Sequence, residues 1–155
     1  MVTRFEQFVS AINGIHRCIQ RIERGEMEKY GLKGYHAQYL MVLMRYSEGV
    51  TAVQMCDICD VNKAAVSRSI SELENQGLVE RRSREGTSTA YRATLVLTEK
   101  GKEAAKWVSL RAQEAVEQAG AGLEPECRAA MYAALDNIAA NLRTICREGI
   151  GQSNT

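Results

Sequence analysis

Apolar residues recur every three or four positions near both ends of this 155-residue chain, and this pattern constrains the fold more than any other feature. The N-terminal series is Phe5, Phe8, Ile12, Ile15, Ile19 and Ile22, and the C-terminal series is Met131, Leu135, Ile138, Leu142 and Ile145. Such spacing places each series along one face of an amphipathic helix. The single proline, Pro125, suits a first helical turn. We therefore predict long helices within residues 1–30 and 125–148.

Both series repeat at close to 3.5 residues, which is typical of helices that pack against other helices. Two arrangements would bury these apolar faces: the two ends of one monomer pack together, or they pack against a second copy of the chain. A small domain rarely needs two such apolar helix faces for its own core. The pattern therefore favours a homodimer.

The composition narrows the class of protein. Hydrophobic residues make up 45% of the chain, and 20 Lys and Arg against 19 Asp and Glu give a net charge of +1, so affinity for a polyanion must come from local clustering. No apolar stretch approaches the ~18 residues of a membrane span, and the N-terminus lacks the pattern of a secretory signal. We expect a cytoplasmic protein with no membrane contact, and five free cysteines rather than a disulfide framework.

Residues 51–77 fit two short helices joined by a tight turn. Thr51 and Asn62 each offer a side-chain oxygen to cap one helix, and the turn falls at Asp60 and Val61. The side chains expected to face inward are Met55, Cys56 and Cys59 on the first helix and Val66, Ile70 and Leu73 on the second. The outward side of the second helix carries Ala64, Ser67, Arg68 and Ser71. A slim face with one guanidinium is typical of a helix that enters the major groove of DNA.

Residues 78–84 and 91–97 predict the two strands of a hairpin, joined by a segment rich in turn formers. Four arginines fall on this short element, Arg81, Arg82, Arg84 and Arg92. They form a local basic cluster, although the net charge of the whole chain is close to zero.

The run VSRSISELENQGLVERR over residues 66–82 and the run LVLTEKG over residues 95–101 resemble the MarR family of bacterial winged helix-turn-helix transcription regulators. The resemblance covers nearly the whole chain. It implies a mainly α fold with a small β-hairpin wing, in one domain over residues 1–155. A DNA-binding lobe would occupy residues 35–100, a linking helix residues 101–120, and the terminal helices would form a dimer.

The resemblance also implies roles for individual residues. Those expected at double-stranded DNA, a pseudo-palindromic operator, are Asn62, Lys63, Ala64, Ser67, Arg68, Ser71, Arg81, Arg82, Arg84 and Arg92. The family's Asp-x-Arg motif of the wing is missing between Arg84 and Arg92, and Ala64 and Ala65 stand where many relatives have Ser or Thr. We expect the base preference to differ accordingly.

Candidate regulatory residues lie on the first two helices. His16, His36 and Tyr39 are candidates for a small-molecule effector pocket, and Cys18 is a candidate redox sensor because some relatives carry a peroxide-reactive cysteine in their first helix. A metal site would combine the two histidines with Glu23 or Glu26, but residues 99–119 lack the histidines that zinc-responsive relatives use, so no metal is expected. The C-x-x-C of Cys56 and Cys59 is interpreted as part of the core, because no second ligand pair accompanies it.

The sequence therefore predicts a homodimeric, sequence-specific DNA-binding transcription regulator, a repressor that a small ligand or an oxidant releases. The alternative is a winged-helix module for protein interaction or dimerisation without DNA specificity. The chain has no nucleophile paired with a base and no glycine-rich phosphate loop, so we expect neither an enzyme nor a cofactor.

Overall fold

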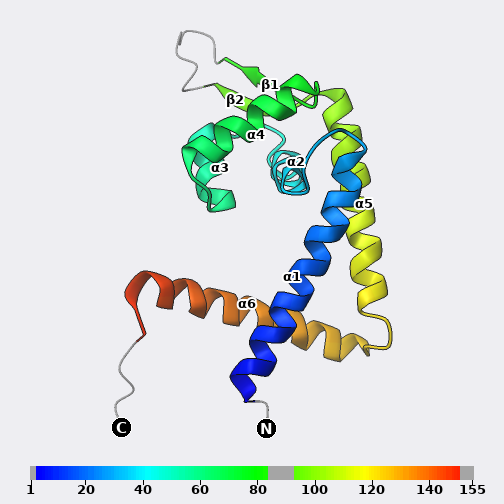
Figure 1. Ribbon diagram of the computed structural model, residues 1–155, viewed down its shortest axis with the longest axis vertical. Helices are drawn as coiled ribbons and strands as arrows, with labels where there is room; N and C mark the ends of the chain where they lie inside the picture. The colour runs from blue at the N-terminus through cyan, green and yellow to red at the C-terminus, as the bar shows by residue number, and fades with distance from the viewer. Residues whose placement is uncertain (1–2, 84–92, 151–155) are drawn as a thin grey trace. The chain divides into compact units, whose positions relative to one another are not determined.

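The computed structural model describes residues 3–83 and 93–150 of the chain (Figure 1). The chain divides into two compact units, Met1–Ala112 and Gln113–Thr155, and each is described by itself. The elements, in chain order, are α1 (Arg4–Glu28), α2 (His36–Arg45), α3 (Ala52–Cys59), α4 (Lys63–Asn75), β1 (Val79–Arg82), β2 (Thr94–Leu97), α5 (Glu99–Ala119) and α6 (Pro125–Glu148). The predicted mainly α fold with a helix-turn-helix and a hairpin is confirmed.

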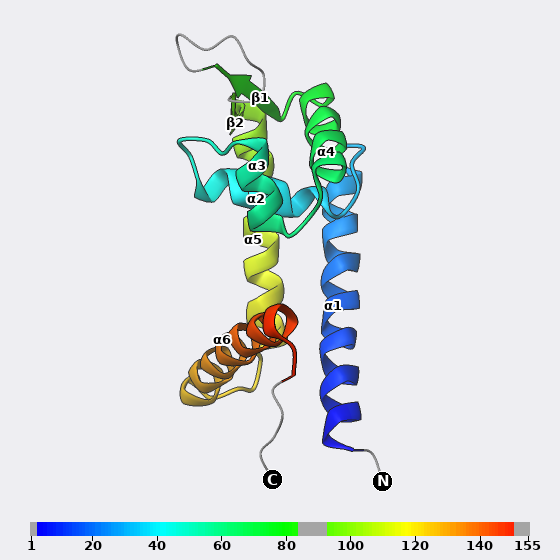
Figure 2. The same cartoon turned by 90° about the vertical axis from the view of Figure 1, so that its left-hand side faces the viewer.

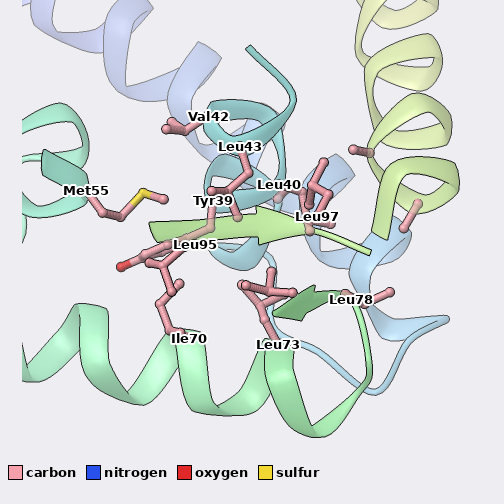
Figure 3. Close-up of a cluster of buried hydrophobic side chains, with 14 of the residues drawn as sticks. Tyr39, Leu40, Val42, Leu43, Met55, Ile70, Leu73, Leu78, Leu95 and Leu97 are labelled. Carbon is pink, nitrogen blue, oxygen red and sulfur yellow. The ribbon is translucent and has the colours of Figure 1, made fainter. Parts of the chain in front are cut away.

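The core of the first unit lies where α2, α3, α4 and the hairpin meet. Its largest fully buried side chains include Leu40 and Leu43 from α2, Met55 from α3, and Ile70 and Leu73 from α4. Figure 3 shows these side chains converging from different elements, with Leu78, Leu95 and Leu97 closing the cluster from the hairpin. The inward faces predicted for the helix-turn-helix are therefore correct for its large apolar residues.

The hairpin is a two-stranded antiparallel sheet in which Val79 pairs with Leu97 and Arg82 pairs with Thr94. Val50, just before α3, adds an isolated bridge to Leu95 through two backbone hydrogen bonds of 3.1 and 2.7 Å. β1 follows α4 closely because Gly77 adopts a left-handed conformation, with φ of +69°, that ends the helix. The hairpin is thereby attached directly to the end of α4.

Helix α1 has two distinct halves within this unit. Met27, near its C-terminus, is fully buried in the core, and the Glu26 carboxylate accepts a 2.7 Å hydrogen bond from the Trp107 indole of α5. The N-terminal half runs away from the group formed by α2, α3 and α4 (Figures 1 and 2). Phe5 and Ile15 on this half are exposed. The predicted amphipathic helix is confirmed, and the apolar side chains of this half are exposed among the described residues.

The second unit contains the end of α5 and the whole of α6. The Arg128 guanidinium closes the turn between them through 2.9 Å hydrogen bonds to the Glu117 carboxylate and to the Gly120 carbonyl oxygen. The predicted apolar stripe lies along α6, where Met131, Leu135, Ile138, Leu142 and Ile145 remain 37–46% exposed. Over the described residues 3–83 and 93–150, no helix is both long and apolar enough to cross a membrane.

Candidate nucleic-acid interface

The helix-turn-helix is built on two side-chain caps and one strained turn residue. Thr51 forms a capping box with Gln54, in which the Gln54 amide donates to the Thr51 hydroxyl at 3.2 Å and the Thr51 amide donates to the Gln54 side chain at 2.8 Å. Asp60 takes the left-handed conformation, with φ of +53°, that turns the chain out of α3. Asn62 then caps α4 by accepting from the Ala65 amide at 2.9 Å. Both predicted caps and the predicted turn are confirmed.

Helix α4 presents two chemically different faces. Val66, Ser69, Ile70 and Leu73 are buried against α2, α3 and the hairpin. The opposite face is exposed and carries the residues that the sequence assigned to DNA: Asn62 and Lys63 at the N-terminus, then Ala64, Ser67, Arg68 and Ser71. The structure thus brings these six residues together on one surface. The short side chains of Ala64, Ser67 and Ser71 would let a double helix approach the backbone of α4 closely.

The hairpin arginines are placed differently from one another. Arg81 on β1 is paired with Glu74 of α4, with 2.8 Å from Nε to Oε1 and 3.2 Å from Nη2 to Oε2. Arg82 contacts its strand neighbour Glu80 at 3.1 Å and is otherwise exposed. Arg84 and Arg92 lie outside the described residues. Arg81 therefore braces the hairpin against α4, a role that the sequence did not suggest.

A large groove of about 900 Å³ lies between α1, the loop that precedes α2, and α2 itself. His16 contributes to its wall, together with Glu23, Arg24 and Tyr35. The other two candidate effector residues do not line it: His36 and Tyr39 are buried in the core. Burial lowers the pKa of His36 and raises the pKa of Tyr39, because both charged forms lose hydration.

The cysteines lie in different environments. Cys18 is exposed on α1, whereas Cys59 is buried with its thiol 3.6 Å from the Met55 sulfur, and burial raises its pKa. Cys56, expected in the core, is only partly buried and lines a cavity of about 170 Å³ with Lys63 and Arg81. No group of three His, Cys, Asp or Glu side chains among the described residues is arranged to hold a metal ion.

Two interactions within the first unit were not evident from the sequence. The carboxylate of Glu72 on α4 lies against His36 and Tyr35, and Glu26 joins α1 to Trp107 of α5. Each pair joins positions far apart in the chain, so no local pattern marks it.

The capped helix pair, the slim exposed face of α4 and the attached hairpin define a winged helix-turn-helix protein. Residues 30–87 match the sequence model of the MarR family. This region is similar to MarR-family domains, and the chain around it has the fold of solved MarR-family structures. The recognition made from the sequence motifs is thereby confirmed. A comparison with curated proteins gives no match.

Two solved structures illustrate the similarity. A MarR transcriptional regulator from Methanosarcina mazei Go1 is 25% identical, with a TM-score of 0.79 over 92% of this chain and 99% of that chain. A putative MarR family regulator from Listeria monocytogenes, solved in complex with a 26mer DNA, is 20% identical, with a TM-score of 0.78 over 94% of this chain and 97% of that chain.

Proposed function

We propose that this protein is a sequence-specific transcription regulator that binds double-stranded DNA as a homodimer. The observation that carries the proposal is the exposed face of α4, where Ser67, Arg68 and Ser71 project from a helix whose other face is buried in the core. A rigid helix with a slim polar face matches the width of the major groove. The DNA complex of the Listeria regulator, which has the same fold, supports this placement.

The side chains of α4 divide by what they can recognise. Arg68 is the donor suited to guanine, because a guanidinium bonds both acceptors of its major-groove edge. Ala64 offers a methyl group for contact with a thymine methyl. Lys63 and Ser71 are suited to the phosphate backbone, which sets register rather than sequence. We expect Arg81 and Arg82 to contribute less positive charge than unpaired arginines, because each is paired with a glutamate, Glu74 and Glu80.

A homodimer accounts for the apolar stripes of the terminal helices. Six apolar side chains on α1 and five on α6 are at least 37% exposed: Phe5, Phe8, Ile12, Ile15, Ile19 and Ile22, and Met131, Leu135, Ile138, Leu142 and Ile145. Exposed apolar surface arranged in long stripes marks a site of association. A twofold dimer would place two α4 helices about one DNA turn apart, on a pseudo-palindromic operator.

We also propose that the protein is a repressor that a small ligand or an oxidant releases. The groove beside α2 is large enough for a small molecule and combines apolar residues such as Ile19 with charged ones such as Arg24. Cys18 on α1 is exposed and accessible to an oxidant. His16 is the candidate effector residue on the groove wall.

The test begins by selecting duplexes from random DNA with the purified protein. We expect a pseudo-palindromic consensus bound by a dimer in sedimentation. Arg68→Ala should leave folding intact and weaken binding to the consensus by about 1–3 kcal/mol. Arg17→Ala, which removes the same charge from the exposed surface of α1, is the matched control and should change consensus binding much less. Failure to select any duplex at low salt would favour a protein-interaction module instead.

A further inference from the structure

The carboxylate of Glu72 makes a polar contact between α4 and the start of α2 with the loop before it. Its Oε2 atom lies 2.8 Å from Nε2 of His36, the first residue of α2, whose side chain is completely buried. The Tyr35 hydroxyl lies 3.5 Å from the same oxygen, at the outer limit of a hydrogen bond. Glu72 itself is partly exposed, so its contacts with Tyr35 and His36 lie at the edge of the core.

Polar groups lie at both nitrogens of the His36 ring. Nδ1 lies 3.1 Å from the amide nitrogen and 3.1 Å from the carbonyl oxygen of Lys33, and Nε2 faces the Glu72 carboxylate. With the ring proton on Nε2, Nδ1 accepts the Lys33 amide hydrogen and the Nε2–H group faces Glu72. The opposite tautomer would place the bare Nε2 lone pair against a carboxylate. The carboxylate lies off the axis of the Nε2–H bond, so the contact is a short electrostatic one rather than a linear hydrogen bond.

The charged and titratable groups around His36 come from three elements. Glu72 on α4 and the backbone of Lys33 in the preceding loop favour the protonated ring, whereas the charge of the Lys33 side chain opposes it. The rings of Tyr35 and Tyr39 lie 4.4 and 6.5 Å from the His36 ring, centroid to centroid. Burial has the largest effect and lowers the pKa of His36. The ring is therefore neutral near pH 7 and acts toward Glu72 as an oriented dipole.

We propose that Glu72 is a positioning residue for DNA binding, which sets the orientation of α4 by holding it to the loop of Tyr35 and His36. The apolar contacts of Val66, Ile70 and Leu73 are non-directional, so they allow small rotations of the helix. The short contact of Glu72 with the buried His36 ring restricts that rotation on the side of α2, as the Arg81–Glu74 pair does on the side of the hairpin. The proposal rests on the proposed function, because it concerns how α4 is presented to the groove.

The loop that precedes α2 also connects the Glu72 contact to the groove. Lys33, Gly34 and Tyr35 form part of the wall of the 900 Å³ groove, and Tyr35 also reaches Glu72. The contact therefore joins the wall of the groove to the recognition helix. A molecule that displaces Tyr35 from the groove wall would act on α4 through Glu72.

The decisive variant is Glu72→Gln, because a purely electrostatic effect and the loss of the positioning contact predict opposite changes in DNA affinity. Removing a negative charge from a DNA-binding protein strengthens DNA binding or leaves it unchanged if only electrostatics matter. Loss of the positioning contact should instead weaken consensus binding by about fivefold to tenfold, as for one partly solvated hydrogen bond to a charged group. Glu103→Gln on α5 removes the same charge from an exposed site and should not weaken binding.

Two further measurements separate positioning from a general structural role. Glu72→Asp keeps the charge but shortens the reach, so it should lose affinity as Glu72→Gln does, with thermal midpoints near that of the parent. NMR titration of the His36 ring should show a lower pKa in Glu72→Gln, because the carboxylate that favours the charged ring is gone.

The outcomes are distinguishable. Consensus binding by Glu72→Gln that equals or exceeds that of the parent would overturn the positioning role. If the unmodified protein binds no DNA, the proposed function fails, and the positioning role fails with it. In that case the NMR titration still tests the contact between Glu72 and His36, because it does not depend on DNA binding. An unchanged pKa of His36 in Glu72→Gln would show that the two side chains do not interact in solution.

Discussion

The guanidinium of Arg81 on β1 holds both carboxylate oxygens of Glu74 on α4, at 2.8 and 3.2 Å. This paired geometry fixes the hairpin relative to the helix as well as neutralising charge. An arginine at the base of a DNA-binding wing would be interpreted from the sequence as a phosphate contact, but here its Nε and Nη2 groups already bond Glu74. The number of basic residues on the hairpin therefore overstates the charge available to DNA.

Glu74→Gln should release the charge of Arg81. Because both side chains are partly exposed, the free energy of unfolding should fall by less than about 1 kcal/mol. Affinity for non-specific duplexes should rise, and the slope of log affinity against log salt should steepen by up to about one per subunit. A salt titration on scrambled DNA measures both quantities, and an unchanged slope would show that Arg81 remains out of reach of the phosphates.

Ile138→Glu should dissociate or unfold the homodimer, because an unpaired carboxylate buried between helices costs several kcal/mol. Ala140→Glu adds the same charge on the opposite side of α6 and should leave the dimer intact, because position 140 lies outside the apolar stripe. Sedimentation of the three proteins at several concentrations tests this. A native monomer in the unmodified protein would refute the dimer.

Gly101→Ala should destabilise the protein by at least about 2 kcal/mol, because its Cβ would collide with the Leu78 backbone carbonyl where α5 packs against the start of the hairpin. Gly25→Ala in α1 is the control. No atom lies within 4 Å of the Cβ that it would add, so alanine should raise stability by about 0.5–1 kcal/mol. Denaturant unfolding of both variants should give effects of opposite sign.

The stability of the protein should fall as the pH drops below 6.5 because of His36. Its ordinary pKa is 6.5, and burial lowers the pKa of His36 in the folded chain. Below pH 6.5 the unfolded chain therefore binds a proton that the folded chain excludes, and unfolding becomes more favourable as the pH falls. The free energy of unfolding of His36→Gln should vary less over this range, and identical pH profiles would contradict the assignment.

Much of the candidate site could be predicted because its determinants are local. Thr51 and Asn62 cap their helices through bonds to residues three positions away, and the two faces of α4 follow from the helical period. Cys56 shows the limit of such reasoning. Its position in the sequence indicates the inward side of α3, but the neighbouring elements cover it only in part.

The sequence by itself determined the element order, the caps, the apolar stripes and the resemblance to MarR regulators, since these depend on spacing along the chain. Only the tertiary structure decided which charges are engaged: Arg81 with Glu74, Glu26 with Trp107, and Glu72 with His36. An ion pair or hydrogen bond requires atoms within a few ångströms, and for residues on different elements that distance is set by how the helices pack. The periodicity of a sequence indicates which face of a helix is buried, but not which polar group lies opposite it.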